Sequence, residues 1–239
     1  AGTAIHNNGV LAINHSGTFT LAQSIDGTGG LAQNGAGTTV LSANSTYTGA
    51  TTVTQGTLEV DGSITSSSVD VSNGGTLSGS GSVGDTVIGS GGTLATPDVQ
   101  NSVRVAGNLQ TAQNSTLALQ GTDQLSGKVM NLQGTQYQQL QSNTLSVAGS
   151  AALSGTVVLN VTPATSLKLN EYYTILTTGS GFLQKTYSLQ TNLTSPYTFI
   201  SPSLFYNGND LDVLMARNSL SFASVTNTRN ERETAQMLD

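Results

Sequence analysis

A Gly-Thr-Leu tripeptide recurs along this chain, and its spacing constrains the fold more than any other feature. Copies that begin with Gly or Ser are Gly56-Thr57-Leu58, Gly75-Thr76-Leu77, Gly92-Thr93-Leu94 and Ser115-Thr116-Leu117. Their leucines lie 19, 17 and 23 residues apart, and looser copies begin at Gly17 and Gly37. A strand-like unit with a period near twenty cannot bury its apolar side alone and must stack on its neighbours. The repeat therefore predicts a coil of stacked β-strand rungs.

The composition favours a folded chain with a weakly charged surface. The sequence has 7 basic and 13 acidic residues among 239, a net charge of −6, and a hydrophobic share of 36%. Segments such as Thr52-Val53-Thr54 and Leu117-Ala118-Leu119 alternate at the strand period of two. These features argue against a disordered chain. Because no basic face is available for phosphate groups, nucleic acid is not a predicted partner.

The chain has no cysteine, which is compatible with export through a pore in an unfolded state. A repetitive β-protein without any transport function can lack cysteine equally well, so both interpretations stay open. Ala1 is not an initiator Met, and no signal peptide precedes it. We therefore expect a piece of a longer precursor.

Aromatic residues gather in the last third of the sequence. Nine of the twelve follow position 170: Tyr172, Tyr173, Phe182, Tyr187, Tyr197, Phe199, Phe205, Tyr206 and Phe222. The last rung of a solenoid exposes unpaired strand edges, so it needs a cap with a core of its own. We predict a β-helix stem over residues 1–162, with the coil continuing through the less regular part after Gln120, and a cap over residues 163–218 in which folding begins.

The final eleven residues differ again, because they hold five charges and no glycine. The charged residues are Arg229, Glu231, Arg232, Glu233 and Asp239. We predict a linker helix over residues 219–239. The alternative is a solvated tail, since a short isolated helix is marginal in water.

Two stretches resemble the passenger domains of bacterial autotransporters, the type V secretion family. One runs from Gly27 to Val60 with the sequence GTGGLAQNGAGTTVLSANSTYTGATTVTQGTLEV, and the other is NGGTLSGSGSV from Asn73 to Val83. The segment from Phe222 to Leu238 is similar to the helical linker of this family. The resemblance implies an all-β fold, a right-handed parallel β-helix (solenoid) with a C-terminal cap and a short linker helix. It also implies that the chain's own C-terminal outer-membrane β-barrel, absent from this sequence, is a partner.

The same resemblance implies a C-terminal autochaperone region that folds first outside the cell. The candidates for its core are six aromatic side chains of the predicted cap. They are Tyr172, Tyr173, Phe182, Phe199, Phe205 and Tyr206.

A formal dinucleotide motif, G-x-G-x-x-G, is present from Gly79 to Gly84, and Asp98 follows it at a plausible distance. The motif works only where a helix after the glycines presents its N-terminus to the pyrophosphate. Here Thr86-Val87-Ile88 indicates a strand instead. We interpret the match as false and predict no cofactor.

Asp210 and Asp212 form an alternating pair of carboxylates, the minimum for glycoside hydrolysis. The competing interpretation, which we favour, is an outward, solvated face of a capping strand. Leu211, Val213 and Met215 would then occupy its inner face.

The two histidines do not predict a catalytic site. His6 and His15 lie near the start of the chain, and Ser16 follows the second, but no G-x-S-x-G motif accompanies them. The acidic residues are scattered and form no calcium-binding repeat. We therefore predict no catalytic residue and no metal site.

The preferred function is that of a stem and autochaperone segment that promotes folding and translocation of a surface-displayed passenger and presents an upstream functional region. The alternative is a surface for adhesion or self-association, with a second copy or a host-surface ligand as the partner. A β-helical carbohydrate-active enzyme ranks last. The segment itself is expected not to be an enzyme, although an upstream domain such as a protease would be compatible. We expect export through the periplasm and outer membrane to the surface of a Gram-negative bacterium.

Overall fold

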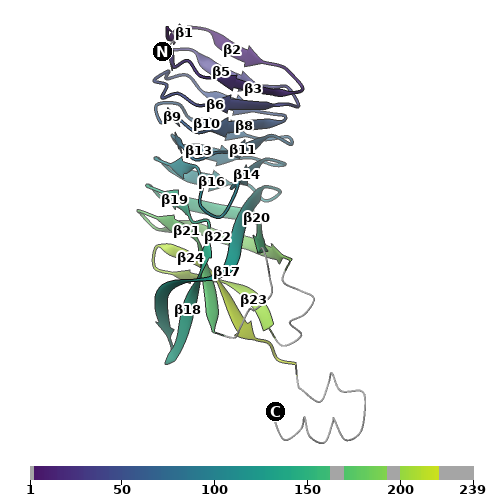
Figure 1. Cartoon of the computed structure of the whole chain (residues 1–239), viewed down its shortest axis with the longest axis vertical. Coiled ribbons are helices and arrows are strands. Elements are labelled where there is room, and N and C mark those ends of the chain that lie inside the picture. Colours follow the sequence, from purple (N-terminus) through teal and green to yellow (C-terminus); the bar gives the residue numbers. More distant parts are fainter. Residues whose placement is uncertain (1–2, 162–169, 193–199, 221–239) are drawn as a thin grey trace, which may run out of the picture.

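The protein is a rod of stacked β-strand rungs (Figure 1). The structure is a computed structural model, and it describes residues 3–161, 170–192 and 200–220. Every regular element within these ranges is a strand, and parallel pairing predominates. The predicted all-β fold, a parallel β-helix, is therefore confirmed. No helix in the described part of the chain is long and apolar enough to span a bilayer.

The strands fall into a regular part and an extended part. The short strands are β1 (Ile5–His6), β2 (Val10–Ile13), β3 (Thr18–Leu21), β4 (Ile25–Asp26), β5 (Gly30–Gln33), β6 (Thr38–Leu41), β7 (Thr51–Val53), β8 (Thr57–Val60), β9 (Ser63–Ile64), β10 (Val69–Val71), β11 (Thr76–Ser78), β12 (Ser82–Val83), β13 (Thr86–Ile88), β14 (Thr93–Ala95), β15 (Arg104–Val105) and β16 (Leu109–Thr111). The later strands are β17 (Thr116–Leu132), β18 (Thr135–Ser142), β19 (Leu145–Val147), β20 (Ala151–Val161), β21 (Glu171–Thr178), β22 (Phe182–Thr191), β23 (Ile200–Asn207) and β24 (Asp210–Arg217).

The tripeptide repeat sets the register of the coil. The four leucines pair directly, rung on rung, and all are fully buried: Leu58, Leu77, Leu94 and Leu117. The preceding threonines form a parallel column on the outside of the same strands, consisting of Thr38, Thr57, Thr76, Thr93, Thr116 and Thr156. Each repeat thus supplies one inward apolar side chain and one outward hydroxyl, as the period-two alternation of a strand requires.

A polar residue interrupts the leucine ladder at one rung. Thr39 pairs with Leu58 and is itself fully buried. Its hydroxyl donates to Gln33 Oε1 over 2.6 Å and lies 3.1 Å from His15 Nε2. Gln33 Nε2 in turn donates to the carbonyl of Gly35. The buried hydroxyl and the buried amide satisfy each other, which removes most of the cost of burying them.

Asx side chains connect successive rungs at the turns. Asp61 Oδ1 accepts bonds from the backbone N–H of Ser80 at 3.1 Å and from its hydroxyl at 3.0 Å. The same double contact recurs in Asn8–Thr28 and Asn108–Ser150. In Asp85–Asn108 the side-chain donor is the amide of Asn108 instead of a hydroxyl. Each contact satisfies a turn N–H that the strands leave free, and it fixes the register of one rung against the next.

Residues 122–142 leave the coil, whereas the segment after Gln120 was expected to continue it. The strand β17 leaves it after Gly121 and forms an antiparallel hairpin with β18, which ends at Ser142. Regular stacking resumes beyond the hairpin, where Thr116 pairs with Thr156 across an interval of 40 residues rather than about 20. The predicted strands within 144–147 and 155–161 are present as β19 and part of β20. The hairpin is thus an insertion between two adjacent rungs.

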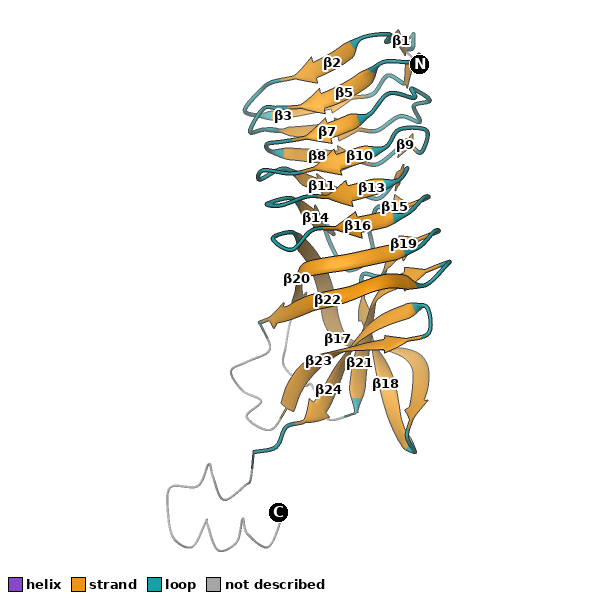
Figure 2. Ribbon diagram, turned by 180° about the vertical axis from the view of Figure 1, so that it is seen from behind, coloured by secondary structure: helices purple, strands orange, loops and turns teal. Residues whose placement is uncertain are grey.

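An antiparallel sheet closes the C-terminal end of the rod (Figure 2). The strand β21 pairs in parallel with β18 and β19 on one side and antiparallel with β24 on the other. Next to β24 lies β23, again antiparallel. We use "cap sheet" for β21, β24 and β23. The predicted linker helix over 219–239 falls almost wholly outside the described residues.

Candidate functional site

Tyr173 is the aromatic centre of the cap sheet. Its side chain is 0% exposed, and its hydroxyl donates to the carbonyl of Thr122 over 3.0 Å. Its ring lies against Gly121, where a Cβ atom would approach the ring to 2.9 Å. The ring therefore connects the sheet to the base of the β17–β18 hairpin. The neighbouring Tyr172, also an expected core residue, is buried on the opposite face of β21.

A second aromatic group joins β22 to β23. The rings of Phe182 and Tyr206 meet edge to face with centroids 5.0 Å apart. Lys185 Nζ lies 4.7 Å from the centre of the Tyr206 ring and 5.8 Å from that of Phe182, a cation–π arrangement. Both rings, like that of Phe205, are only partly buried. Phe199 lies outside the described residues.

Tyr187, which is not among the six core candidates, also packs against the hydrophobic core. The Tyr187 hydroxyl lies 2.8 Å from Thr111 Oγ1, which also donates to the carbonyl of Ser154. Burial raises the pKa of Tyr187 well above its usual value. Tyr187 lies among the clustered aromatic residues of the sequence, so it could have been chosen as a core candidate. Its hydrogen bond with Thr111, 76 positions away, could not be predicted from the sequence.

The two carboxylates of β24 have different environments. Asp210 is half-buried and accepts a bond of 2.8 Å from the hydroxyl of Thr177. Asp212 is 1% exposed, so the expected solvated face is wrong for this residue. Burial, opposed by a hydrogen bond from Thr174 and reinforced by the charge of Asp210, raises the pKa of Asp212 to about 6. The expected inner face of Leu211, Val213 and Met215 is confirmed, since all three are fully buried. A buried Asp212 cannot reach a polysaccharide, which argues against glycoside hydrolysis by this pair.

The two histidines lie near the N-terminal end of the rod, and their side chains have different hydrogen-bond partners. His6 Nδ1 is 2.6 Å from Asp26 Oδ1, and both side chains are largely exposed. Its other ring nitrogen faces the Asn8 side chain rather than a hydroxyl. His15 contacts the buried Thr39 hydroxyl and packs edge-on against Phe19. Among the described residues, the hydrogen bonds of both rings go to Asp26, Asn8 and Thr39, and none goes to a serine hydroxyl.

The glycines of the formal dinucleotide motif have a packing function. Gly79 has a φ of +123°, and a Cβ on it would collide with the backbone of Val60. Gly81 and Gly84 are equally close to the backbone of the preceding rung. The residues between them enter the strand β12, and no helix follows. The interpretation of this match as false is therefore supported by the geometry.

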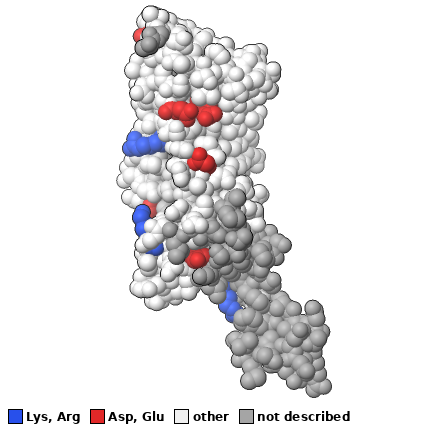
Figure 3. All heavy atoms as spheres, viewed as in Figure 1, with Lys and Arg blue, Asp and Glu red and all other residues white. Residues whose placement is uncertain are grey.

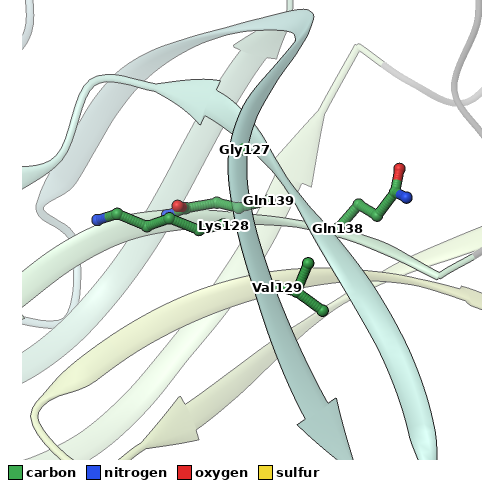
Figure 4. Close-up of a pocket in the computed structure, with 5 residues that line it drawn as sticks. All are labelled: Gly127, Lys128, Val129, Gln138 and Gln139. Atoms are coloured by element: carbon green, nitrogen blue, oxygen red, sulfur yellow. The ribbon is translucent and has the colours of Figure 1, made fainter.

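The described residues contain a cavity at the β17–β18 hairpin. It has a volume of about 130 Å³ and is lined by Gly127, Lys128, Val129, Gln138 and Gln139. Figure 4 shows Lys128 and Gln139 directed to one side of this hairpin and Gln138 to the other. In the part of the chain that the structure describes, no three His, Asp or Glu side chains lie close enough together to bind one metal ion. Figure 3 shows few charged side chains on the visible face of the rod.

Comparison with known proteins agrees with this picture. Residues 31–60 match the family model described as Passenger-associated-transport-repeat. The chain is 32% identical over 228 residues to an "Extracellular serine protease" of Serratia marcescens, covering 91% of this chain and 20% of that protein. It is 38% identical over 94 residues to an "Adhesin BmaC autotransporter" of Brucella suis biovar 1 (strain 1330), covering 38% of this chain and 3% of that protein. These findings support an autotransporter passenger domain.

The residues that match the passenger repeat can be located in the coil. Residues 31–60 run from the second residue of β5 to the end of β8, and so include the buried Thr39 and the first leucine of the regular ladder, Leu58. The chain spans about a fifth of the length of the protease relative. The predicted export to the bacterial surface agrees with the names of both relatives, one an extracellular protease and the other an autotransporter.

Proposed function

We propose that this chain is the C-terminal stem and autochaperone segment of a secreted, surface-displayed passenger. The stem, residues 1–162, holds an upstream functional region away from the outer membrane. The cap, residues 163–218, folds early outside the cell and provides the first surface on which further rungs stack. The linker, residues 219–239, leads to the outer-membrane β-barrel that belongs to the same precursor.

The change in strand pairing at the C-terminal end carries this proposal. Parallel rungs can add to one another without limit, but an antiparallel sheet such as β21–β24–β23 ends the series. Tyr173 provides this sheet with a large buried side chain and connects it to the hairpin. A unit with its own core is suited to fold before the rungs that depend on it.

Surface display in the full precursor tests the proposal. Leu176 in the cap sheet and Leu77 in the stem are both fully buried, and each Leu→Ala change costs about 2–5 kcal/mol of unfolding free energy. We expect Leu176→Ala and Tyr173→Ala to reduce display, measured with antibody on intact cells, far more than Leu77→Ala does. Equal display by the Leu176 and Leu77 variants would contradict an early-folding cap.

We propose further that the chain is not itself an enzyme. The protease relative extends far beyond the matched segment, so its name is compatible with a catalytic domain outside that segment. A fluorophosphonate probe, which labels active serine hydrolases, should leave the purified chain unlabelled. Labelling that heat denaturation abolishes would overturn this part of the proposal.

A second candidate function, adhesion or self-association, is favoured by the threonine column. Hydroxyls stand in register along one side of the rod on six paired rungs, from Thr38 to Thr156, and few charges oppose the approach of another neutral surface. Many weak hydrogen bonds, each contributing about 1 kcal/mol or less, could join two such columns. The relative named an adhesin supports this candidate. Sedimentation over a broad concentration range tests it, and a monomer throughout would argue against self-association.

A further inference from the structure

Asp212 is a buried carboxyl group that the proposed function does not use. It lies on β24, the middle strand of the cap sheet, opposite Thr174 of β21 and Phe205 of β23. Its side chain is 1% exposed. Within the described residues, its Oδ1 atom has no hydrogen-bond partner and no cation forms an ion pair with it. An ionised carboxylate in such a position is costly.

A chain of hydrogen bonds connects Asp212 with the β17–β18 hairpin. The Ser126 hydroxyl donates to Gln139 Oε1 over 2.8 Å, and Gln139 Nε2 donates to Thr174 Oγ1 over 2.8 Å. Since Thr174 Oγ1 accepts from Gln139, its proton is free to be donated to Asp212, with which it is hydrogen bonded. We call Ser126, Gln139, Thr174 and Asp212 the polar relay. Its members come from four strands, β17, β18, β21 and β24, so it joins the hairpin to the cap sheet.

The groups around the relay favour a neutral carboxyl. On β24 itself, Asp210 adds a like charge, and on β21 the phenol of Tyr172 has its pKa raised by burial and by the charges of Asp212 and Asp210. Glu171, also on β21, is buried and pairs with Met215 of β24 rather than with Asp212. On β23, the buried hydroxyl of Tyr206 has no partner among the described residues. None of these groups supplies a positive charge, and Lys185 of β22 lies over the ring of Tyr206 without an ion pair to a carboxylate of the described residues.

We propose that Asp212 is a proton-dependent latch, which stabilises the cap sheet and the hairpin joined to it when the carboxyl group is protonated. The neutral group is buried without a charge penalty and retains the contact with Thr174. The ionised group retains that contact but leaves an uncompensated charge in the sheet. The proposal rests on the geometry of the cap alone, and it stands whether or not the cap acts as an autochaperone.

The direction of the pH dependence follows from linkage. The pKa of Asp212 is raised from 3.8 to about 6 in the folded chain, so the folded state binds more protons than the unfolded state between these values. The stabilisation is fully present below pH 3.8 and is lost as the pH rises through about 6. Across this window we expect the unfolding equilibrium constant of the cap to change about 100-fold through this group.

Urea unfolding from pH 4 to pH 8 tests the latch. Asp212→Asn imitates the protonated carboxyl, so it should be more resistant to urea than wild type at pH 7.5 and should lose most of the pH dependence. Asp210→Asn, which changes a half-buried carboxylate on the same strand, should retain the dependence. An Asp212→Asn variant with the wild-type pH profile, or one less stable than wild type at pH 7.5, would overturn the proposal.

Hydrogen exchange on the unmodified chain keeps the test independent of the variants. After correction for the intrinsic pH dependence of exchange, backbone amides of β21 and β24 should gain protection as the pH falls from 7 to 4.5. Amides of β8 and β11 in the stem, which lie far from Asp212 along the sequence, should not. A uniform change over all strands, or none in the cap sheet, would contradict a latch at Asp212.

Discussion

Replacing Leu77 by Ala tests the idea that the leucine ladder holds the stem together. Leu77 is 0% exposed and pairs with Leu58 on one side and Leu94 on the other. Removal of a buried leucine side chain costs the transfer free energy of the lost carbons and an added amount for the cavity. Because backbone hydrogen bonds fix both neighbouring rungs, the cavity cannot collapse easily. We expect a loss of about 3–5 kcal/mol, in the upper part of the usual range.

The location of the loss is as informative as its size. In a solenoid each rung contacts only its neighbours, so the opening should begin at β8, β11 and β14 and leave the cap sheet protected. Urea titration followed by circular dichroism measures the total, and hydrogen exchange assigns it to strands. Val87→Ala is a suitable control, because Val87 on β13 is 39% exposed and should change stability by no more than about 0.5 kcal/mol.

Two results would refute this reasoning. A loss below about 1 kcal/mol in Leu77→Ala would mean that the ladder contributes little beyond ordinary surface contacts. Equal loss of protection in the stem and the cap would mean that the rod unfolds as one unit, and the additive rung picture would fail.

Three further substitutions probe the turns and the cap by urea unfolding. Asp61→Ala removes an inter-rung acceptor at a turn and should cost about 1–2 kcal/mol, and an unchanged midpoint would make the contact irrelevant to register. Gly79→Ala combines positive φ with a backbone collision and should cost about 2–4 kcal/mol, more than Gly74→Ala, which shares the positive φ but has open space. Tyr173→Phe loses the bond to the Thr122 carbonyl and should cost about 1 kcal/mol; a neutral result would assign the stabilisation to the ring alone.

The sequence predicted the parallel β-helix well because its repeat and its register have the same cause. An inward leucine at 58 requires an inward leucine one rung later, so the spacing of 19 and 17 residues to Leu77 and Leu94 is also the pairing interval. Local alternation and long-range stacking therefore agree. The interruption at Thr39 was harder to see, because it depends on the buried partner Gln33.

The β17–β18 hairpin could not be predicted from the same pattern. Alternation in this segment identifies strands but does not say whether they pair in parallel with a rung or antiparallel with each other. The burial of Asp212 was missed for a related reason. Alternation of apolar and polar residues predicts a solvent-exposed face only where no other element covers that face. Within the cap, β21 and β24 are buried on both faces.

The scarcity of charge follows from the in-register stacking of the coil. Outward side chains in parallel rungs stand directly over one another, about 4.8 Å apart, and like charges at that distance destabilise the pair. The few acidic residues obey this constraint, because Glu59 pairs with Val40 and Ser78, and Asp70 pairs with Thr52 and Val87. Columns of hydroxyl groups avoid this repulsion and still form hydrogen bonds with water. A long parallel coil thus requires a weakly charged surface whether or not that surface binds a partner. The weak charge alone is therefore no evidence for self-association, which needs its own experimental support.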